Sequence, residues 1–287
     1  MKKINIFIEL TRLNKPIGFM LLFWPCSWGL TLAYSFDREI TLYFKYLILF
    51  FLGSVLMRSA GCIFNDIVDR DLDKRVKRTK KRPIASKKIS VLNAFFYVIL
   101  LCLIALIILL QFNQLTIMLG MSSMILAFAY PFMKRITYWP QLFLGLTFNW
   151  GIIMGYAAIT NNISLESIML YIAAIFWTLG YDTIYGIQDI KDDEIIGVKS
   201  TSIKFKNYAK LFVSSCYLLC IFFILMLYFK METNKYTLTL SLFFILSLIY
   251  QIKVFSTSNS ESCLRCFKMN NLTGLLIFIF IYGFTVL

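Results

Sequence analysis

Long apolar runs alternate with short polar segments along the whole chain. Each run holds roughly 18–22 residues, close to the ~20 that an α-helix needs to cross the hydrocarbon of a bilayer. The pattern predicts an all-α, polytopic membrane protein with nine transmembrane helices. Since no polar linker is long enough to divide them, residues 1–287 are expected to form a single domain. The nine runs are residues 16–35, 43–64, 91–111, 114–132, 140–160, 165–185, 208–229, 236–254 and 270–287.

The composition agrees with this pattern and excludes a soluble domain. Of 287 residues, 59% are hydrophobic and 15% are charged, and the mean hydropathy is +0.74. Those values belong to a protein that uses the bilayer as its solvent. Residues 2–15 mix apolar and charged side chains ahead of the first run. They predict a short interfacial helix and not a cleaved signal, because the run that follows has full length.

The net charge of +14 suggests nucleic acid at first, but its distribution favours membrane orientation. Most of the 29 Lys and Arg residues fall in alternate loops, on the side that also carries the N-terminus and two acidic clusters. Positively charged loops stay in the cytoplasm, so we expect the N-terminus and both clusters there and the C-terminus outside. The chain contains no histidine, which excludes His-dependent triads and imidazole metal sites.

The first acidic cluster is the sequence NDIVDRDLD at residues 65–73, directly after the second run. Asn65, Asp69 and Asp73 are spaced i, i+4, i+8, which places them on one face if the helix continues. Hard oxygen ligands of this kind suit Mg²⁺, which commonly shares its coordination with substrate phosphates. This stretch therefore predicts a magnesium site where a transmembrane helix meets water.

The second acidic cluster follows the sixth run, with Asp189 and Asp193 again spaced i, i+4 and Asp182 on the same helical face. Similar basic segments follow the two clusters, at residues 76–79 and 198–201. We interpret the likeness as a faint internal duplication, which places both clusters on the same side of the membrane.

Several cations lie close to these acids. Arg58 falls inside the second run, where a charge is costly unless it has a partner. Two interpretations stay open for it: an ion pair with a nearby Asp, or a contact with a substrate anion in a cavity. The basic segment 74–88 fits a positive-inside loop, and a subset of its side chains could also engage a diphosphate. The candidate diphosphate contacts are Lys77, Arg78 and Arg82, and the fourth run ends in the cation pair Lys134 and Arg135.

The chemistry that fits this arrangement is the departure of a diphosphate. Two acidic clusters at one membrane face can hold Mg²⁺ on either side of that group, and the metal would stabilise its developing charge. A chamber poor in water would protect the carbocation left behind. Because the site opens at a bilayer, the sequence predicts a lipid-tailed substrate such as a polyprenyl diphosphate.

The motif NDIVDRDLD resembles the NDxxDxxxD motif of the UbiA family of intramembrane prenyltransferases, and the segment from Asp189 to Asp193 resembles its second motif, DxxxD. Further blocks are similar to the branch of the family that prenylates 4-hydroxybenzoate. These blocks are KPIG at 15–18, LFWP at 22–25, MRSAGC at 57–62, VKRTKKRP at 76–83, YPFMKR at 130–135, GYDTIY at 180–185, CFK at 266–268 and NN at 270–271.

This resemblance implies nine helices around a central cavity open to the cytoplasm, in the bacterial inner (plasma) membrane. It also implies that the ring carbon of 4-hydroxybenzoate ortho to the hydroxyl attacks the allylic carbon of a polyprenyl diphosphate, a step of ubiquinone biosynthesis. Arg58 and Arg135 are implied as candidates for binding the carboxylate, and Asp182 or Asp189 for orienting or deprotonating the phenol. Asp71 faces away from the stripe and is left out of the metal set. The implied Mg²⁺ ligands are Asn65, Asp69, Asp73, Asp189 and Asp193.

Two kinds of alternative remain. Sister prenyltransferases would use the same metal with another acceptor, such as dihydroxynaphthoate, haem or a chlorophyll precursor. A transporter would use its intramembrane charges to bind ions, but transporter sites lie near the bilayer midplane, whereas these acids cluster at one face.

Overall fold

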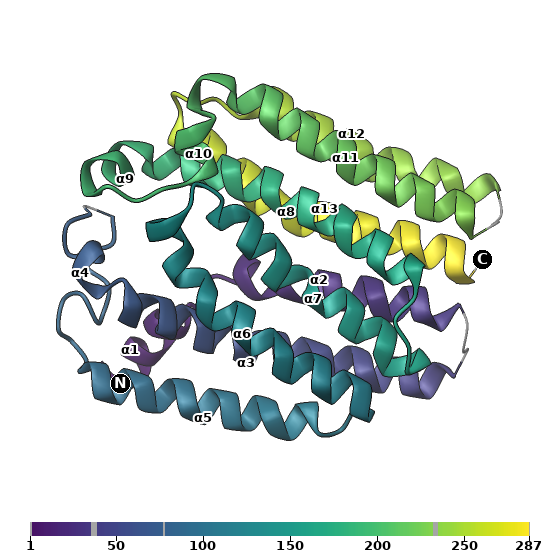
Figure 1. The fold of residues 1–287 in the computed structure, drawn as a ribbon, viewed down its shortest axis with the longest axis horizontal. Coiled ribbons are helices and arrows are strands. Elements are labelled where there is room, and N and C mark those ends of the chain that lie inside the picture. The colour runs from purple at the N-terminus through teal and green to yellow at the C-terminus, as the bar shows by residue number, and fades with distance from the viewer. Residues whose placement is uncertain (1, 36–38, 77, 232–234, 287) are drawn as a thin grey trace.

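The computed structural model describes residues 2–35, 39–76, 78–231 and 235–286, and within these ranges the fold is a bundle of helices with no β-strand (Figure 1). In the described residues, nine helical segments are long and apolar enough to cross a membrane, as predicted from the apolar runs. The long helices are α2 (Ile17–Tyr34), α3 (Ile40–Val68), α5 (Val91–Leu109), α6 (Gln114–Ile136), α7 (Pro140–Thr160), α8 (Leu165–Gly186), α11 (Ala209–Lys230), α12 (Ser241–Val254) and α13 (Ser260–Val286).

The bounds differ from the expected spans mainly at the last helix. It begins at Ser260, ten residues before the apolar run at 270–287. Hydropathy does not predict these first turns, because they carry the charged residues Glu261, Arg265 and Lys268. A helix can continue beyond the apolar stretch that crosses the bilayer, since its backbone hydrogen bonds do not depend on hydrophobic side chains. Hydropathy alone therefore locates the span but not the helix end.

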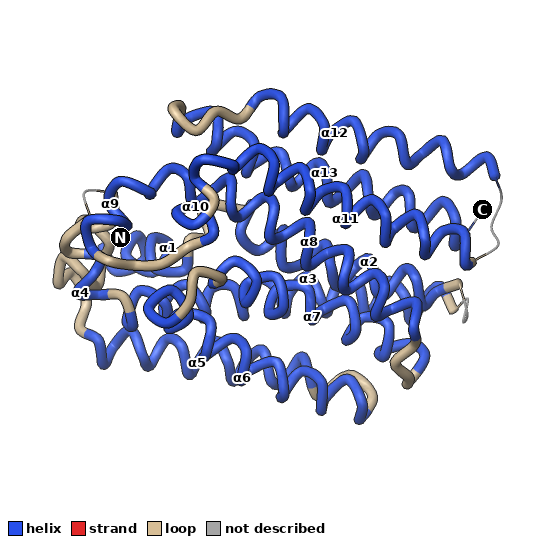
Figure 2. Tube along the Cα trace, turned by 45° about the horizontal axis from the view of Figure 1, so that its top comes forward, coloured by secondary structure: helices blue, strands red, loops and turns tan. Residues whose placement is uncertain are grey.

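The short helical elements gather at one end of the bundle, opposite the end where α13 finishes (Figures 1 and 2). We call this the acidic end, because α4 and α9 carry residues of the two acidic clusters. The N-terminal helix agrees with the interfacial helix predicted from residues 2–15. The short elements are α1 (Lys2–Thr11), α4 (Arg70–Asp73), the 3₁₀ turn η1 (Ile187–Asp189), α9 (Ile190–Ile196), α10 (Thr201–Lys204) and a second 3₁₀ turn, η2 (Lys206–Tyr208). A third 3₁₀ turn, η3 (Lys235–Leu240), precedes α12.

The first acidic cluster spans a break between α3 and α4. Asp69 lies between these helices with φ −94° and ψ 4°, outside helical geometry. Its N–H nevertheless donates to the carbonyl of Asn65 at 2.9 Å, and the N–H of Asp73 donates to the carbonyl of Asp69 at 2.8 Å. The i to i+4 hydrogen bonds thus continue through the break, so the three ligand candidates keep a common register.

Close packing of α2 against α7 forms the centre of the bundle. A Cβ at Gly29 would lie 2.0 Å from the carbonyl oxygen of Ile152, and a Cβ at Gly155 would lie 2.4 Å from that of Cys26. Gly151 likewise faces Cys26. Gly151 and Gly155, four residues apart in α7, thus let the two backbones approach closely.

Buried polar groups connect the other central helices. The indole N–H of Trp28 donates to the carbonyl of Gly274 at 3.0 Å, which links α2 to α13. Asn149, fully buried in α7, donates to the hydroxyl of Thr178 at 2.8 Å and to the carbonyl of Ala174 at 3.1 Å, both in α8. In an apolar bundle such contacts fix which helix faces which, because an unpaired polar group there is costly.

Candidate active site

A cavity of about 1250 Å³ opens between α2, α3, α5, α6, α7 and α8. Residues of both acidic clusters line it, and they come from α3 and α4 on one side and from α8, η1 and α9 on the other. The two clusters therefore meet at one end of the molecule, as the sequence predicted. The residues of the two clusters that line the cavity include Asn65, Asp66, Asp69, Asp73, Asp182, Asp189 and Asp193.

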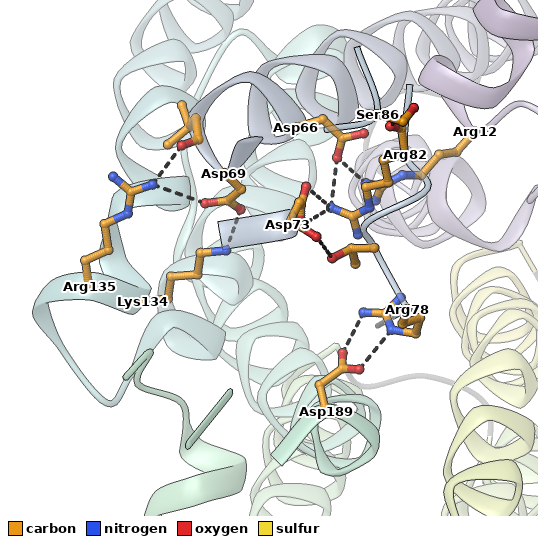
Figure 3. A network of polar contacts seen from close by, with 12 residues as sticks. Arg12, Asp66, Asp69, Asp73, Arg78, Arg82, Ser86, Lys134, Arg135 and Asp189 are labelled. Carbon is orange, nitrogen blue, oxygen red and sulfur yellow. Dashed lines mark hydrogen bonds and ion pairs between the residues drawn. The ribbon is translucent and has the colours of Figure 1, made fainter. Parts of the chain in front are cut away.

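Asp69 is held by the cation pair at the end of α6 (Figure 3). Its side chain is 1% exposed and contacts the ammonium of Lys134. The guanidinium of Arg135 lies 3.4 Å from the other carboxylate oxygen and donates to the carbonyl of Val68 at 2.8 Å. Lys134 lines the cavity, whereas Arg135 is not among the residues that line it and its side chain is 42% exposed. Lys134 and Arg135 thus contact different oxygens of the same carboxylate.

Asp73 belongs to a chain of charges that also includes residues outside the predicted site (Figure 3). Arg82 donates to Asp73 at 2.9 Å and, with the same nitrogen, to Asp66 at 3.0 Å. Asp66 also accepts from Arg12 at 2.6 Å and its side chain is only 2% exposed. The sequence analysis assigned no role to Arg12 or Asp66.

The missed pair had only weak signals in the sequence. Asp66 lies one position from Asn65 and therefore off the i, i+4, i+8 stripe. Arg12 follows the last residue of α1 and takes a left-handed conformation, with φ 55°, where the chain turns before Lys15 and Pro16. Such a conformation is uncommon for a residue other than glycine, and an arginine in the sequence does not predict it.

Asp189 joins the two halves of the acidic end. It accepts from Arg78 at 2.9 and 2.6 Å in a bidentate pair, although the two residues are 111 positions apart (Figure 3). Parallel hydrogen bonds from one guanidinium to one carboxylate are among the stronger polar contacts in proteins. Arg78 and Arg82 thus lie at the cavity as predicted for that loop, while Lys77 falls outside the described residues.

Arg58 lies farther from the acidic end, in the middle of α3. Its Nε is buried without a hydrogen-bond partner, and its guanidinium packs 5.3 Å from the ring centre of Phe148. A Cβ at Gly18 would lie 2.8 Å from Nε, so this glycine leaves room for the arginine. Within the described ranges, no ion pair joins Arg58 to a carboxylate. Of the two interpretations open for Arg58, the one that requires a direct ion pair with a nearby Asp is therefore not seen among the described residues.

Asp182 shares this deeper part of the cavity. Asp182 interacts electrostatically with Arg58, and each of the two also interacts electrostatically with Tyr130 in α6. No hydrogen bond joins the Asp182 carboxylate to another described side chain. A carboxylate and a guanidinium, both with free hydrogen-bonding capacity, therefore face the same space above the ion pairs of the acidic end.

The rim of the cavity is rich in positive charge. Burial lowers the pKa of the Lys15 ammonium, and repulsion from Arg12, Arg78 and Arg82 lowers it further. Arg12, Arg78 and Arg82 are themselves paired with acids of the two clusters. This end of the cavity therefore holds cations and carboxylates together, which suits a ligand that combines a metal ion with a negatively charged group.

The donor set fits a hard divalent cation by its chemistry, although its members are not gathered as a complete shell. In the part of the chain that the structure describes, no three Asp, Glu, Cys or His side chains lie close enough to hold a metal ion by themselves. Mg²⁺ usually takes only one or two carboxylates and completes its octahedron with water and phosphate oxygens. Two small acidic clusters facing one cavity match that requirement when a phosphate ligand is present.

Comparison with known proteins agrees with this geometry. A relative from Aliivibrio fischeri, a 4-hydroxybenzoate octaprenyltransferase, is 41% identical over 285 residues, which cover 97% of this chain and 96% of the relative. An Arabidopsis thaliana protein, a mitochondrial 4-hydroxybenzoate polyprenyltransferase, is 40% identical over 96% of this chain and 68% of its own length.

Solved structures show the same fold at lower identity. The apo structure of a UbiA homologue from Aeropyrum pernix matches with a TM-score of 0.76 and 22% identity, over 91% of this chain and 96% of the homologue. A UbiA homologue from Archaeoglobus fulgidus, bound to DMAPP and Mg²⁺, matches with a TM-score of 0.74 and 16% identity, over 98% and 99% of the two chains. The model of the UbiA prenyltransferase family matches residues 22–272, which is most of the sequence. With the cavity and its two acidic clusters, these matches show that the chain belongs to the UbiA prenyltransferase family.

Proposed function

We propose that the protein transfers a polyprenyl group from polyprenyl diphosphate to the ring carbon ortho to the hydroxyl of 4-hydroxybenzoate, releasing diphosphate, as a step of ubiquinone biosynthesis. The observation that carries the proposal is the single cavity with acids and cations at one end and Arg58 with Asp182 deeper inside. The names of relatives about 40% identical over nearly the full chain support this acceptor.

The orientation follows from the positive-inside rule. The basic loops 74–88 and 198–210 lie at the acidic end, so we place that end and the N-terminus in the cytoplasm of a bacterial inner membrane. Residues 1–287 would act as one UbiA-type transmembrane unit, with the prenyl tail in the bilayer. Soluble 4-hydroxybenzoate would then enter from the cytoplasm, and the product would leave into the lipid.

At the acidic end, Asn65, Asp69, Asp73, Asp189 and Asp193 would hold Mg²⁺ together with the diphosphate. The UbiA homologue from Archaeoglobus fulgidus has been solved with Mg²⁺ and either DMAPP or GPP, which supports a divalent metal here. When bound, the metal neutralises the diphosphate and makes it a better leaving group.

The cations at this end would bind and orient the leaving group. Those that now pair with the acids, Lys134, Arg78 and Arg82, can turn toward phosphate oxygens as the acids take up the metal. Lys77 stays a candidate for the same role from the sequence, whereas Arg135 stays a candidate for binding the carboxylate of 4-hydroxybenzoate.

Deeper in the cavity, the chain positions the acceptor. Arg58 would bind the carboxylate of 4-hydroxybenzoate, and Asp182 would accept the phenolic proton, which makes the ortho carbon more nucleophilic. The carbon–oxygen bond to diphosphate breaks and a bond forms between the allylic carbon and the ring. The ring proton would then pass to the released diphosphate while Asp182 returns its proton to the phenolic oxygen, which restores the aromatic phenol. Asp189 is the alternative base, but its bidentate pair with Arg78 favours a role in holding the metal and its diphosphate.

The direct test uses the full-length protein in membranes with labelled 4-hydroxybenzoate, polyprenyl diphosphate and Mg²⁺. We expect labelled lipid that depends on all three components and disappears with EDTA. Dihydroxynaphthoate, a haem precursor and a chlorophyll precursor are offered in parallel. Transfer only to one of these would identify a sister enzyme, and transfer to none would reject the proposal.

Arg58→Ala is expected to raise the Michaelis constant for 4-hydroxybenzoate roughly 10- to 100-fold, as the loss of a charged hydrogen bond to the acceptor should. The constant for the prenyl diphosphate should change much less. Steady-state kinetics with each substrate varied in turn measure both values. Arg135→Ala, made in parallel, removes a cation that pairs with Asp69 and lies outside the cavity lining. If Arg135→Ala shows the larger effect on the aromatic acid, the carboxylate site belongs to Arg135.

A further inference from the structure

One buried tyrosine hydroxyl beside the cavity lacks a hydrogen-bond partner. Tyr181 of α8 is 1% exposed and lines the cavity, and within the described residues its hydroxyl makes no hydrogen bond. Thr178 comes near it from the preceding turn, but the Thr178 hydroxyl accepts from Asn149 and does not reach Tyr181 with hydrogen-bonding geometry. A buried hydroxyl without a partner is costly, and a phenylalanine of the same shape would avoid that cost. We therefore expect the partner to lie outside the folded chain.

Aromatic neighbours hold the ring of Tyr181 in place. Trp177, one turn earlier in α8, packs edge to face with 4.9 Å between ring centres, and Phe267 of α13 packs at 5.9 Å. The indole N–H of Trp177 donates to the side-chain oxygen of Asn270 at 2.8 Å, and both of these residues are fully buried. Such close packing keeps the ring from turning toward another protein group, so the hydroxyl has a fixed position.

The hydroxyl lies among the groups of the deeper part of the cavity. It interacts electrostatically with Asp182 and Arg58, which both line the cavity. Arg58 is seven residues from Asn65, and Tyr181 is eight residues from Asp189. At about 1.5 Å per residue, both side chains belong to a level roughly 10–12 Å from the acidic end. Tyr181 and Arg58 therefore face the same space.

The unpaired groups at this level match the two ends of a para-substituted phenol. Nε of Arg58 and the hydroxyl of Tyr181 are donors, and the two oxygens of one carboxylate can accept from both. The Asp182 carboxylate is an acceptor, which suits a phenolic hydroxyl. Because Tyr181 and Asp182 are successive in α8, their side chains diverge by about 100° around the helix axis and reach different parts of a ligand. The donors and the acceptor can thus bind opposite ends of one molecule.

We propose that the Tyr181 hydroxyl donates to the carboxylate of the aromatic acceptor beside Arg58, and that it makes the site selective for phenols that carry this acid group. The inference rests on the proposed function, from which it takes the acceptor. Arg58 supplies the charge, and Tyr181 supplies a neutral donor of fixed direction. Tyr181 is therefore a specificity-determining residue, and it exchanges no proton in the reaction.

Tyr181→Phe removes the hydroxyl and keeps the ring. We expect the KM for 4-hydroxybenzoate to rise about tenfold or more, with kcat changed by less than about threefold. Trp150 lines the cavity, so quenching of tryptophan fluorescence by prenyl diphosphate with Mg²⁺ measures donor affinity, which should not change. Tyr171→Phe is the matched control in α8. The Tyr171 hydroxyl donates to the carbonyl of Leu146 at 2.8 Å, outside the cavity lining, so its loss should leave both substrates unaffected.

Two analogues identify the end of the acceptor that Tyr181 contacts. Benzoate keeps the carboxylate without the hydroxyl, and 4-methylphenol keeps the hydroxyl without the carboxylate. Competition with labelled 4-hydroxybenzoate bound to the full-length protein measures the affinity of each. Tyr181→Phe should weaken benzoate about tenfold and leave 4-methylphenol unchanged. The reverse result would place the Tyr181 hydroxyl at the phenolic oxygen, and equal or absent effects would place it outside the acceptor site. Either outcome overturns the proposal.

Thermal unfolding without substrates gives an independent check. Tyr181→Phe should not lower the melting temperature, because the hydroxyl has no partner among the described residues, whereas Tyr171→Phe should lower it. A lower melting temperature for Tyr181→Phe would show that the hydroxyl is structural and would contradict the inference. If the wild-type protein binds 4-hydroxybenzoate but never prenylates it, the proposed function fails while the binding comparison still tests Tyr181. Absence of any 4-hydroxybenzoate binding would refute both.

Discussion

Asp189→Asn is expected to reduce prenyl transfer by about a thousandfold or more while the protein stays folded in the membrane. The substitution keeps the size of the side chain but removes the charge that would hold the metal and its diphosphate, an electrostatic contribution of this order in comparable sites. Its side chain is 16% exposed and pairs with a half-exposed Arg78, and an amide oxygen can still accept one hydrogen bond from that guanidinium, so the protein should stay folded. Transfer rates at saturating donor and Mg²⁺, with thermal unfolding of the purified variant, measure the two effects.

Asp71→Asn is the matched control for that variant. Asp71 lies inside the first acidic cluster, but its side chain is 65% exposed and pairs only with Arg70 and Lys74. Near-normal transfer by Asp71→Asn with inactive Asp189→Asn would separate ligand position from general negative charge. Retention of activity in Asp189→Asn would contradict the metal assignment.

Asp182→Asn is expected to lower kcat by about 10²- to 10⁴-fold, the range typical for loss of a positioned general base. The affinity for prenyl diphosphate should remain, because Asp182 lies deeper in the cavity beside Arg58 and makes no contact with the ion pairs of the acidic end. Tryptophan fluorescence titration with donor and Mg²⁺ should therefore give a nearly unchanged affinity for Asp182→Asn and a much weaker one for Asp189→Asn.

The two variants thus distinguish two roles. If Asp182→Asn keeps its kcat, the proton must go elsewhere, and Asp189 becomes the candidate base. If Asp182→Asn instead loses donor affinity, the Asp182 carboxylate belongs to the diphosphate site. The cavity would then not be divided into a diphosphate site at the acidic end and a separate, deeper acceptor site.

Hydropathy was sufficient to predict the membrane helices, because each span must satisfy its backbone internally and bury a fixed length of apolar side chains. The first acidic cluster could be predicted for a similar reason: the N–H of Asp69 donates to the carbonyl of Asn65 and the N–H of Asp73 donates to that of Asp69, which preserves helical register. The distant pairs were not readable. Arg12 with Asp66 and Arg78 with Asp189 join positions 54 and 111 residues apart, and no periodicity in the sequence encodes such separations.

The deeper site was predicted only in part. Arg58 stood out because a charge inside an apolar run demands an explanation. Its surroundings depend instead on Phe148 and Gly18, which belong to other helices, and within the described residues it forms no ion pair.

Asp66 is shared by two guanidiniums, and this has a consequence for Arg82. If Arg82 turned away from its acids, a singly paired carboxylate at this depth would be left bare, which typically costs about 3–5 kcal/mol. Arg12 remains on Asp66 and compensates its charge, so Arg82 can leave Asp66 at low cost. Its other partner, Asp73, would be compensated by the metal that it is proposed to hold. The buried Arg12–Asp66 pair thus lets Arg82 move away from Asp66 without destabilising the surrounding helices.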